Sequence, residues 1–598
     1  MILEHYIDFL DGNGFVKVQP PQEWKKFSIQ LSFEEGNERL SSSNFSWVGD
    51  NAEYINNYIT GGSTGVTNGI FEGLPYQIRF NCDNIQYTIL DACVNLASSE
   101  AKYSCEEVNL PIREKGKIDF LNDVADSFRF AYLFAIRQNI PPFGNPVAGQ
   151  ITYNDFIDVW YVQGQYPQKF EIMLASVTLY VTLKETFEVV KRIGDVLADV
   201  FNIPTGGIVS ALKLVLLIIY LVLLIIALIE LLQKLIDLIF PFVYFHRAMY
   251  VKTLFEKACE YLGFNFSSSI FDVGGLGYNE YILPEKNEEG KKVGNNTVET
   301  GFFNGTFGDL IRGYKEKYNA EIKIIGNTLH FEHEDYFIDQ SNFVIPNVYQ
   351  KPNNEFTYNA SEVPANYVIS YRYDVADLNN LSFRFGTQFT ARIEPATITN
   401  RQNILLSNLD ERNIPFTIPN IKTSESDLEK TMTKVFNGIA ELVNTIASVV
   451  GNSTPIPLIP FGGNQDILIL DTHLTSSPKI GIYQGGGKTN PLSVSNYLDA
   501  EILWNRYHAS RSAYGFPPFQ SNQWKIYKDV EIPLCCEDYL ILKNNNYATY
   551  QGNDARIESI DWNPYDQVAK ITFRVRNVYT TNLKLIATNS ENVSTVYQ

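Results

Sequence analysis

The chain has 598 residues, more than one hydrophobic core normally serves, so three or four domains are expected. Apolar residues make up 45% of it, with 39 Phe and 36 Tyr, and this aromatic enrichment favours β-sheets over helical bundles. The formal net charge of −19 argues against a surface that follows nucleic-acid phosphates, because such surfaces concentrate Lys and Arg. We therefore expect an α+β fold that is predominantly β, with no specific nucleic-acid binding.

Cysteine usage and the N-terminal sequence both bear on the compartment. The six cysteines show no CxxC spacing and are too sparse for a disulfide framework, so reduced, mostly buried thiols are expected. The first residues carry acids where a signal peptide needs a basic region and an apolar core, so Sec-dependent export is not expected.

Composition and turn signals divide the chain into six predicted regions. Alternating apolar runs broken by Gly, Asn and Ser predict strand-rich regions, whereas apolar residues three and four apart predict helices. The predicted regions are a β-rich N-terminal domain (1–203), an apolar helix (204–245), an α/β domain (246–340), a β-rich segment (341–425), an amphipathic helix with a Pro-rich apolar loop (426–465) and a β-rich C-terminal domain (466–598).

The apolar helix, predicted over 207–240, is the most unusual feature. From Leu214 the sequence reads LVLLIIYLVLLIIALI without a charge, and residues 208–229 would extend about 33 Å at roughly 1.5 Å per residue, enough to cross a bilayer core of about 30 Å. Its few interruptions fall on one stripe with a seven-residue period, which suits packing of the helix against copies of itself. The stripe consists of Lys213, Tyr220, Ala227 and Lys234, with Glu230 and Asp237 beside it. The helix is thus expected to form bundles or to be membrane-active; the alternative is burial inside one large domain.

Two further helical regions are predicted downstream. In the α/β domain, helices over 249–263 and 307–318 each lead into a strand, and Gly326-Asn327 turns the second strand back into a hairpin. The amphipathic helix is predicted over 428–450, with one continuous apolar face. The prolines that follow it, at positions 455, 457 and 460, exclude a helix there.

Three short motifs are candidates for chemistry, and none is convincing. The run Gly485-Gly-Gly-Lys-Thr489 lacks the first glycine of a phosphate-binding loop, and Asn490-Pro491 stands where its helix should begin. The run His330 to Asp335 offers metal ligands, but in a strand they alternate between faces, which favours a solvated hairpin. Vicinal Cys535 and Cys536 on a strand would place one thiol inside and one near the surface. We therefore expect no catalytic, cofactor-binding or metal-binding residues, no cofactor, and no enzyme activity.

The helix-plus-hairpin unit from Gly308 to Glu332 resembles that of tail-tip (baseplate hub) proteins of tailed bacteriophages. Further segments are similar to members from phages of Bacteroidota, and the resemblance covers about 246–440 and 500–585. These segments are Pro364 to Tyr371, Ile557 to Trp562, Phe573 to Val575 and Tyr579 to Leu583.

The resemblance implies a structural virion protein of the phage tail without catalytic residues. Such a protein forms a ring oligomer around the tail axis, with a homotrimer favoured, and contacts other tail proteins. It closes the tube and takes part in host-envelope penetration, where it meets the host membrane, and in DNA ejection. The apolar helix departs from what is expected of such a hub. Two alternatives stay open: a single-span membrane protein with large soluble domains, and a polysaccharide-degrading tail enzyme.

Overall fold

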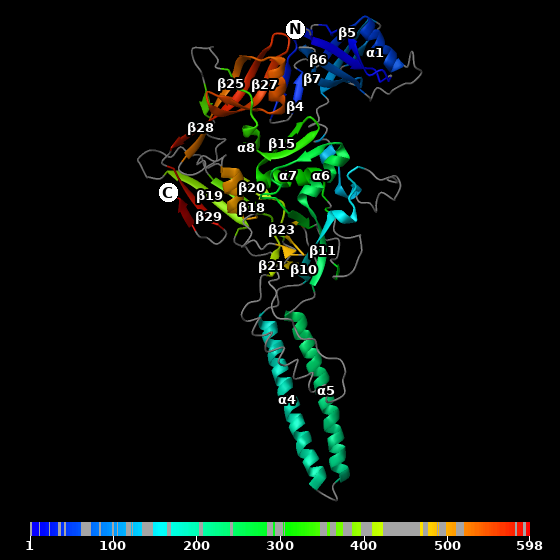
Figure 1. Cartoon of the computed structure of the whole chain (residues 1–598), viewed down its shortest axis with the longest axis vertical. Helices are drawn as coiled ribbons and strands as arrows, with labels where there is room; N and C mark the ends of the chain where they lie inside the picture. The colour runs from blue at the N-terminus through cyan, green and yellow to red at the C-terminus, as the bar shows by residue number, and fades with distance from the viewer. Residues whose placement is uncertain are drawn as a thin grey trace.

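The structure is a computed structural model of the whole chain, in which a broad body of several sheets carries a long helical hairpin at one end (Figure 1). Strand residues outnumber helical ones, so the fold mixes the two with an excess of β. The structure describes residues 3–10, 12–22, 24–33, 37–40, 44–60, 73–82, 85–97, 101–104, 106–114, 121, 124–133, 148–163, 169–202, 207–239, 243–283, 291–292, 303, 305–346, 356–358, 366–374, 386–395, 409–422, 467–470, 477–486, 488–489, 498–509, 520–580, 583–589 and 594–597. The predicted helix 428–450 and the Pro-rich loop after it lie outside these residues.

An N-terminal sheet forms one side of the body. Helix α1 (Asp50–Thr60) contacts its strands β5 and β9, and the side chains of Trp47 and Tyr76 are buried within it. The strand order is β2 (Phe15–Val18), β1 (Leu3–Asp8), β6 (Leu74–Cys82), β7 (Ile85–Val94), β9 (Glu107–Glu114) and β5 (Asn44–Val48), with β8 (Lys102–Tyr103) on β9. A 3-10 turn, η1 (Trp24–Lys26), precedes β3.

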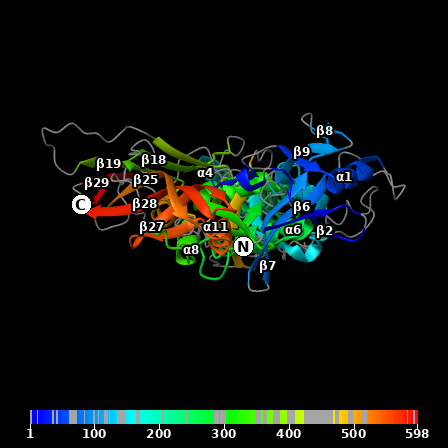
Figure 2. The same cartoon turned by 90° about the horizontal axis from the view of Figure 1, so that it is seen from above.

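The C-terminal sheet lies beside the N-terminal sheet (Figure 2) and includes two strands from the start of the chain. Strand β3 pairs antiparallel with β27, so that Ile29 faces Trp562 across more than 500 residues of sequence. The order is β17 (Thr357–Tyr358), β25 (Gln520–Pro533), β28 (Val568–Thr580), β27 (Asn553–Asn563), β3 (Ile29–Ser32) and β4 (Asn37–Leu40), with β26 (Tyr547–Tyr550) on β27. One apolar core joins the two sheets, which belong to regions that the sequence presents as separate domains.

The central region confirms the predicted pairs of helix and strand. Helix α6 (Val251–Leu262) leads into β12 (Asn265–Ser267), and α7 (Phe307–Tyr318) leads into β15 (Ala320–Ile325), which turns at Gly326 into β16 (Thr328–His333). A capping box at Thr306 starts α7, and Asn319 in the left-handed conformation ends it. Strand β12 runs parallel to β16 in this three-stranded sheet.

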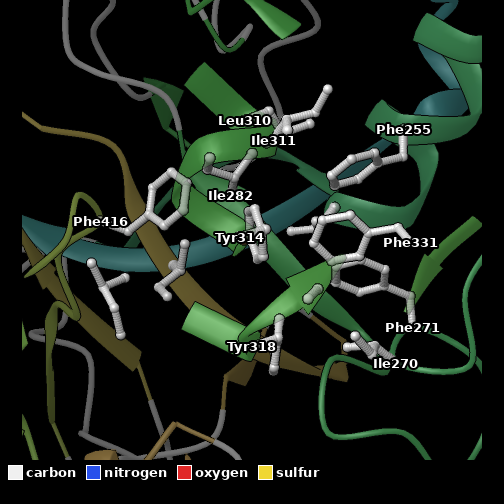
Figure 3. Packing of buried hydrophobic residues seen from close by; sticks show 14 of the residues in the cluster. Phe255, Ile270, Phe271, Ile282, Leu310, Ile311, Tyr314, Tyr318, Phe331 and Phe416 are labelled. Carbon is white, nitrogen blue, oxygen red and sulfur yellow. The ribbon is translucent and has the colours of Figure 1, made fainter. Parts of the chain in front are cut away.

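Aromatic side chains fill the core between α6, α7 and the three-stranded sheet (Figure 3). Tyr314 lies at its centre, with the rings of Phe271 and Phe416 at 5.7 and 4.9 Å between centroids, and Phe255 packs against Phe331. Edge-to-face and tilted ring pairs of this kind stabilise a core beyond their buried area. The short helix α8 (Glu334–Asp339) follows β16, and α10 (Ala500–Leu503) continues into a π-helical turn (Trp504–His508) whose residues also join this core.

Two more sheets complete the body. The first, here called the root sheet, has the order β21 (Asn420–Lys422), β22 (Ile467–Leu470), β10 (Phe156–Gln163), β11 (Val243–Tyr250), β13 (Glu280–Leu283), β23 (Lys479–Gly485) and β24 (Lys488–Thr489), with β14 (Lys291–Lys292) on β11. The second has the order β20 (Leu409–Ile414), β18 (Asn366–Tyr371), β19 (Gln388–Pro395), β29 (Leu583–Asn589) and β30 (Ser594–Tyr597). Two 3-10 turns, η2 (Phe130–Leu133) and η3 (Tyr153–Asp155), precede β10.

Lys323 on β15 connects the central region to the C-terminal sheet. Its Nζ donates to the Oδ1 atoms of Asn546 and Asn545 at 2.6 and 3.1 Å, after α11 (Cys536–Asn544), and lies 4.1 and 4.6 Å from the ring centroids of Phe337 and Tyr547. Burial lowers the pKa of Lys323 from 10.5 to about 7, against the opposing effect of Glu321.

The lowered pKa of Lys323 predicts a specific pH dependence. Between pH 7 and 10.5 the unfolded chain binds the proton that the folded chain has lost, so stability rises with pH across this window. We expect Lys323→Met to raise the free energy of unfolding most at or below pH 7. This gain in stability should shrink toward pH 10, by up to about 1.4 kcal/mol per pH unit. Denaturant titrations of both proteins at several pH values check this, with exposed Lys528→Met as the control. A difference between wild type and Lys323→Met that is constant from pH 7 to 10 would contradict it.

Candidate functional site: the α4–α5 hairpin

A pair of long helices projects from the root sheet as a hairpin: α4 (Lys169–Asn202) runs outward and α5 (Gly207–Ile239) returns (Figure 1). The hairpin continues two neighbouring strands, because α4 follows β10 and α5 precedes β11. These strands pair antiparallel over seven residues, from Phe156 with Met249 to Val162 with Val243. The strand before α4 and the strand after α5 are therefore direct neighbours in the root sheet.

A buried ion pair, to which two tyrosine hydroxyls also donate, connects the root sheet to α7. Glu280 on β13, two strands from β10, accepts from Nζ of Lys317 through both carboxylate oxygens at 2.6 Å, and both side chains are 0% exposed. The hydroxyls of Tyr314 and Tyr318 donate to the same carboxylate at 2.8 and 2.5 Å. Burial lowers the pKa of Lys317, opposed by the Glu280 charge, and raises the pKa of both tyrosines well above their usual value. The sequence did not single out these residues, because Glu280 is distant in the chain from Tyr314, Lys317 and Tyr318.

Helix α4 is absent from the sequence-based expectations, since residues 169–202 fall in the predicted β-rich N-terminal domain. That assignment is wrong for this segment. One face of α4 is buried or half-buried with a spacing of alternately three and four residues, the signature of a helix that packs along a heptad seam. The inward residues are Leu179, Thr182, Thr186, Val189, Ile193 and Val196. The two threonines donate to the carbonyls of Thr178 and Thr182 at 2.9 and 2.7 Å, so their hydroxyls are satisfied within the helix.

Helix α5 contributes the matching seam, which consists of leucines, with buried Ile225 beside it. The residues have the same alternating spacing and are buried or half-buried, and α4 is the main contact of α5 among the described elements. They are Leu214, Leu217, Leu221, Leu224, Leu228 and Leu231. The inner surface of the hairpin is therefore a two-helix seam with heptad spacing on both sides.

The stripe predicted from the sequence lies next to this leucine seam and does not form it. Lys213 and Tyr220 are exposed, Ala227 is half-buried and Glu230 is exposed. The predicted stripe and the leucine seam share a seven-residue spacing but occupy neighbouring positions of the helix. Leu214, the remaining predicted residue with a described side chain, belongs to the seam itself. The side chains of Lys234 and Asp237 lie outside the described residues.

The outer face of α5 is apolar and open to solvent. Nine large side chains between positions 212 and 226 are between 37% and 64% exposed. They are Leu212, Val215, Leu216, Ile218, Ile219, Tyr220, Val222, Leu223 and Ile226. Lys213 is the one charged residue in the sequence of this stretch. We call these nine residues the outer face of α5; sequence analysis could not separate them from the inner seam, because both are aliphatic.

The outer face of α4 is different in kind, because exposed charges run along its middle. Both signs are represented, together with scattered exposed apolar side chains such as Tyr180 and Phe187. The exposed charged residues are Lys184, Glu185, Glu188, Lys191, Arg192 and Asp195. The hairpin thus has one charged side, formed by α4, and one apolar side, formed by α5.

On sequence alone, segment 207–240 is expected to be long enough to cross a bilayer. The structure describes α5 side chains from Leu212 to Leu228 and those of Glu230 and Leu231. Within the parts of the chain that the structure describes, no helix is both long enough and apolar enough to cross a membrane.

The inner seam gives a direct stability prediction. Leu228 is 2% exposed, so Leu228→Ala removes buried methyl groups and leaves a cavity between the helices. We expect the hairpin to lose about 2 kcal/mol, near the lower end for such a change in a core. Hydrogen exchange of α4 and α5 peptides measures the loss. Leu197→Ala, at an exposed position of α4, serves as the control and should change the free energy of exchange by less than about 0.5 kcal/mol. Equal effects of the two variants would contradict the packing of Leu228 between the two helices.

The glycine-rich candidate loop is a turn between strands. Gly485 and Gly486 adopt positive φ angles of 99° and 58°, and Lys488–Thr489 form β24, which pairs back on β23. A phosphate-binding loop would place this lysine at the start of a helix. The expectation that this motif does not bind nucleotide phosphates is consistent with this geometry.

The residues from His330 to Asp335 are used structurally. The predicted hairpin is present, but the expectation that these residues are solvated is wrong, because Glu332, His333 and Glu334 are buried. Glu332 accepts from the backbone N–H and the hydroxyl of Ser269 at 2.7 and 2.5 Å, and Nδ1 of His333 caps α8 by accepting from the N–H of Asp335. Among the described residues, no group of three or more His, Cys, Asp or Glu could hold a metal ion.

The vicinal cysteines start a helix and do not lie on a strand. Cys535 is the N-cap of α11, where its Sγ accepts from the N–H of Asp538 at 3.4 Å and donates to its carboxylate at 3.1 Å. Cys536 is 1% exposed, whereas Cys535 is half-buried, so the predicted difference in burial is confirmed although its cause is a helix cap.

Comparisons with known proteins add little to this picture. No family model and no curated protein matches the sequence. A comparison of structures finds the prophage tail protein gp18 from Listeria monocytogenes EGD-e, which is 9% identical and aligns over 96% of this chain and 94% of that one with a TM-score of 0.31. A TM-score of this size does not establish a shared fold, so the match carries no conclusion about function.

Proposed function

We propose that the chain is a structural subunit of a phage tail, located at its tip, and that it assembles with copies of itself through the α4–α5 hairpin. The single observation that carries self-assembly is the apolar outer face of α5, on a hairpin that projects from the body (Figure 1). The location rests on the resemblance of the helix-plus-hairpin unit from Gly308 to Glu332 to tail-tip proteins.

The energetics favour a covered outer face. Fully burying one large aliphatic side chain contributes roughly 1.5 to 3 kcal/mol. Covering the nine side chains of the outer face, each about half exposed, would therefore contribute on the order of 10 kcal/mol per chain. Monomeric proteins rarely expose a continuous apolar surface of this extent unless it is a binding site.

A ring oligomer around the tail axis fits this geometry. Subunits related by rotation would bring their hairpins together at the axis, where a bundle of helices would close the tube. A threefold ring and contacts with other tail proteins are part of the proposal. Host penetration and DNA ejection would then begin with displacement of this bundle.

Two other functions are less well supported by the hairpin. A resident membrane protein would have to place the six exposed charges of α4 beside lipid, at a cost of about 2.5 to 3.5 kcal/mol for each Lys, Arg or Asp at the centre of a spanning helix. A polysaccharide-degrading enzyme is a proposal that no group of residues in the described parts of the chain carries, and turnover on host surface glycans is its test.

Locating the protein in particles tests the proposed function. Antibodies raised against the chain should label the tail tip of purified phage particles produced by the phage that encodes it, as seen by electron microscopy. Mass spectrometry of the same particles should find the chain in a small, fixed copy number. Absence from particles, with recovery in the cell membrane fraction after carbonate extraction, would contradict the proposal.

A further inference from the structure

We infer that the partner of the outer face of α5 is the same face in two other copies, so that three α5 helices pack in parallel and the three α4 helices surround them. The inference rests on the proposed function for the existence of an oligomer and for its threefold order. The arrangement itself follows from the spacing, the side-chain shapes and the charges of the hairpin.

The outer face contains a second heptad seam. Val215, Ile219, Val222 and Ile226 are separated by four, three and four residues, and Leu212 continues the spacing toward the tip. This is the pattern of a helix that packs along a partner helix of the same kind. Helix α5 therefore has two such seams, and α4 covers only the one formed by leucines.

The side chains of this second seam favour more than two helices. β-Branched residues at both core positions of a parallel coiled coil disfavour dimers and shift the preference to trimers or tetramers. Leu216, Ile218 and Leu223 flank the seam and are 59%, 45% and 58% exposed, so the apolar surface is wider than a two-stranded contact would cover. Three copies, each with α4 on the outside, cover this surface in a closed arrangement.

The charges decide which helix lies inside. An axial position for α4 would bring its six exposed charged residues from three copies into a dry core, where each unpaired charge is costly. With α5 inside, these charges stay in water, and Lys213 near the tip is the one charged residue between positions 212 and 228 that approaches the axis. The same charges make lipid a poor occupant of the outer face, because α4 lies alongside α5 for much of its length.

Rotation about an axis along the hairpin makes the copies parallel. Both helices leave the body from the paired strands β10 and β11, so a rotation axis along the hairpin aligns all copies in the same direction. Rotation also brings each residue opposite its own counterpart. Val222 of one copy should therefore lie near Val222 of the next.

Chemical cross-linking and mass measurement of the full-length chain test this arrangement. Val222→Cys should form dimers and trimers on denaturing gels with a short bis-maleimide linker, whereas Glu188→Cys on the charged side of α4 and the wild type should not. By light scattering, the wild type should have about three times the 68.0 kDa mass of one chain.

A matched pair of charge insertions identifies the face. Ile219→Glu on α5 should reduce the mass to that of one chain, while Val190→Glu on α4 should leave it unchanged; the two side chains are 52% and 43% exposed, so neither variant disturbs the inner seam. Unchanged mass for Ile219→Glu, cross-linking of Glu188→Cys but not Val222→Cys, or an assembly of another order would overturn the inference. A chain that forms this trimer but is absent from phage tails would instead contradict only the proposed function.

Discussion

Replacing Lys317 with methionine should lower the free energy of unfolding of the central region by about 3 to 5 kcal/mol. The substitution leaves the Glu280 carboxylate fully buried, with its charge no longer balanced by the ammonium group at 2.6 Å. Tyr314 and Tyr318 still donate to that carboxylate, but neutral hydroxyls do not replace a cation in a medium of low polarity. Hydrogen exchange of peptides from β13 and α7, read at increasing denaturant, measures the loss.

A double-mutant cycle separates the ion pair from simple packing. Glu280→Gln together with Lys317→Met removes both charges and keeps an acceptor for the tyrosine hydroxyls. The double variant should be more stable than the sum of the two single losses predicts, by about 2 kcal/mol. Additive losses would show that the two charges do not depend on each other, contrary to the structure.

Replacing Trp562 with alanine should destabilise the C-terminal sheet by about 3 to 5 kcal/mol. The ring is 0% exposed, stacks on Tyr539 at 4.2 Å between centroids, and donates from Nε1 to the carbonyl of Leu534 at 2.9 Å. Because Trp562 pairs with Ile29 of β3, the loss should also loosen the N-terminal strands joined to this sheet. Limited proteolysis followed by mass spectrometry would find new cleavage both near β27 and near β3.

Trp562→Phe provides the matched control. It keeps an aromatic ring against Tyr539 but loses the hydrogen bond to Leu534, so a smaller loss of roughly 1 to 2 kcal/mol is expected. If cleavage in Trp562→Ala were confined to the C-terminal strands, the shared core of the two sheets would be excluded.

Local patterns were sufficient for part of the fold. Helices α6 and α7, the strands that follow them and the turn at Gly326 were predictable because each depends on residues within about one turn or one hairpin. The pairing of β3 with β27 was not, since no local signal specifies a partner more than 500 residues away. That pairing unites two regions that the sequence presents as separate domains.

The hairpin shows a different limit. In α5 nearly every position is aliphatic, so periodicity cannot distinguish the leucine seam from the outer face, and the few polar residues attract attention to a neighbouring stripe. In α4 the seam contains Thr182 and Thr186, which weaken the apolar repeat even though their hydroxyls are satisfied within the helix. A count of heptad positions from Leu179 to Val196 would have found α4. The buried Glu280–Lys317 pair has no sequence signature at all, because burial of a charge depends on elements brought together by the fold.

One image tests the central claim that the hairpins assemble copies of this chain. Electron cryo-microscopy of the purified full-length assembly should show threefold symmetry, with six helices at the axis and the three α5 helices innermost. Three bodies should surround the base of this bundle, each joined to it through β10 and β11. Hairpins that lie apart from one another, or α4 helices at the axis, would contradict the account.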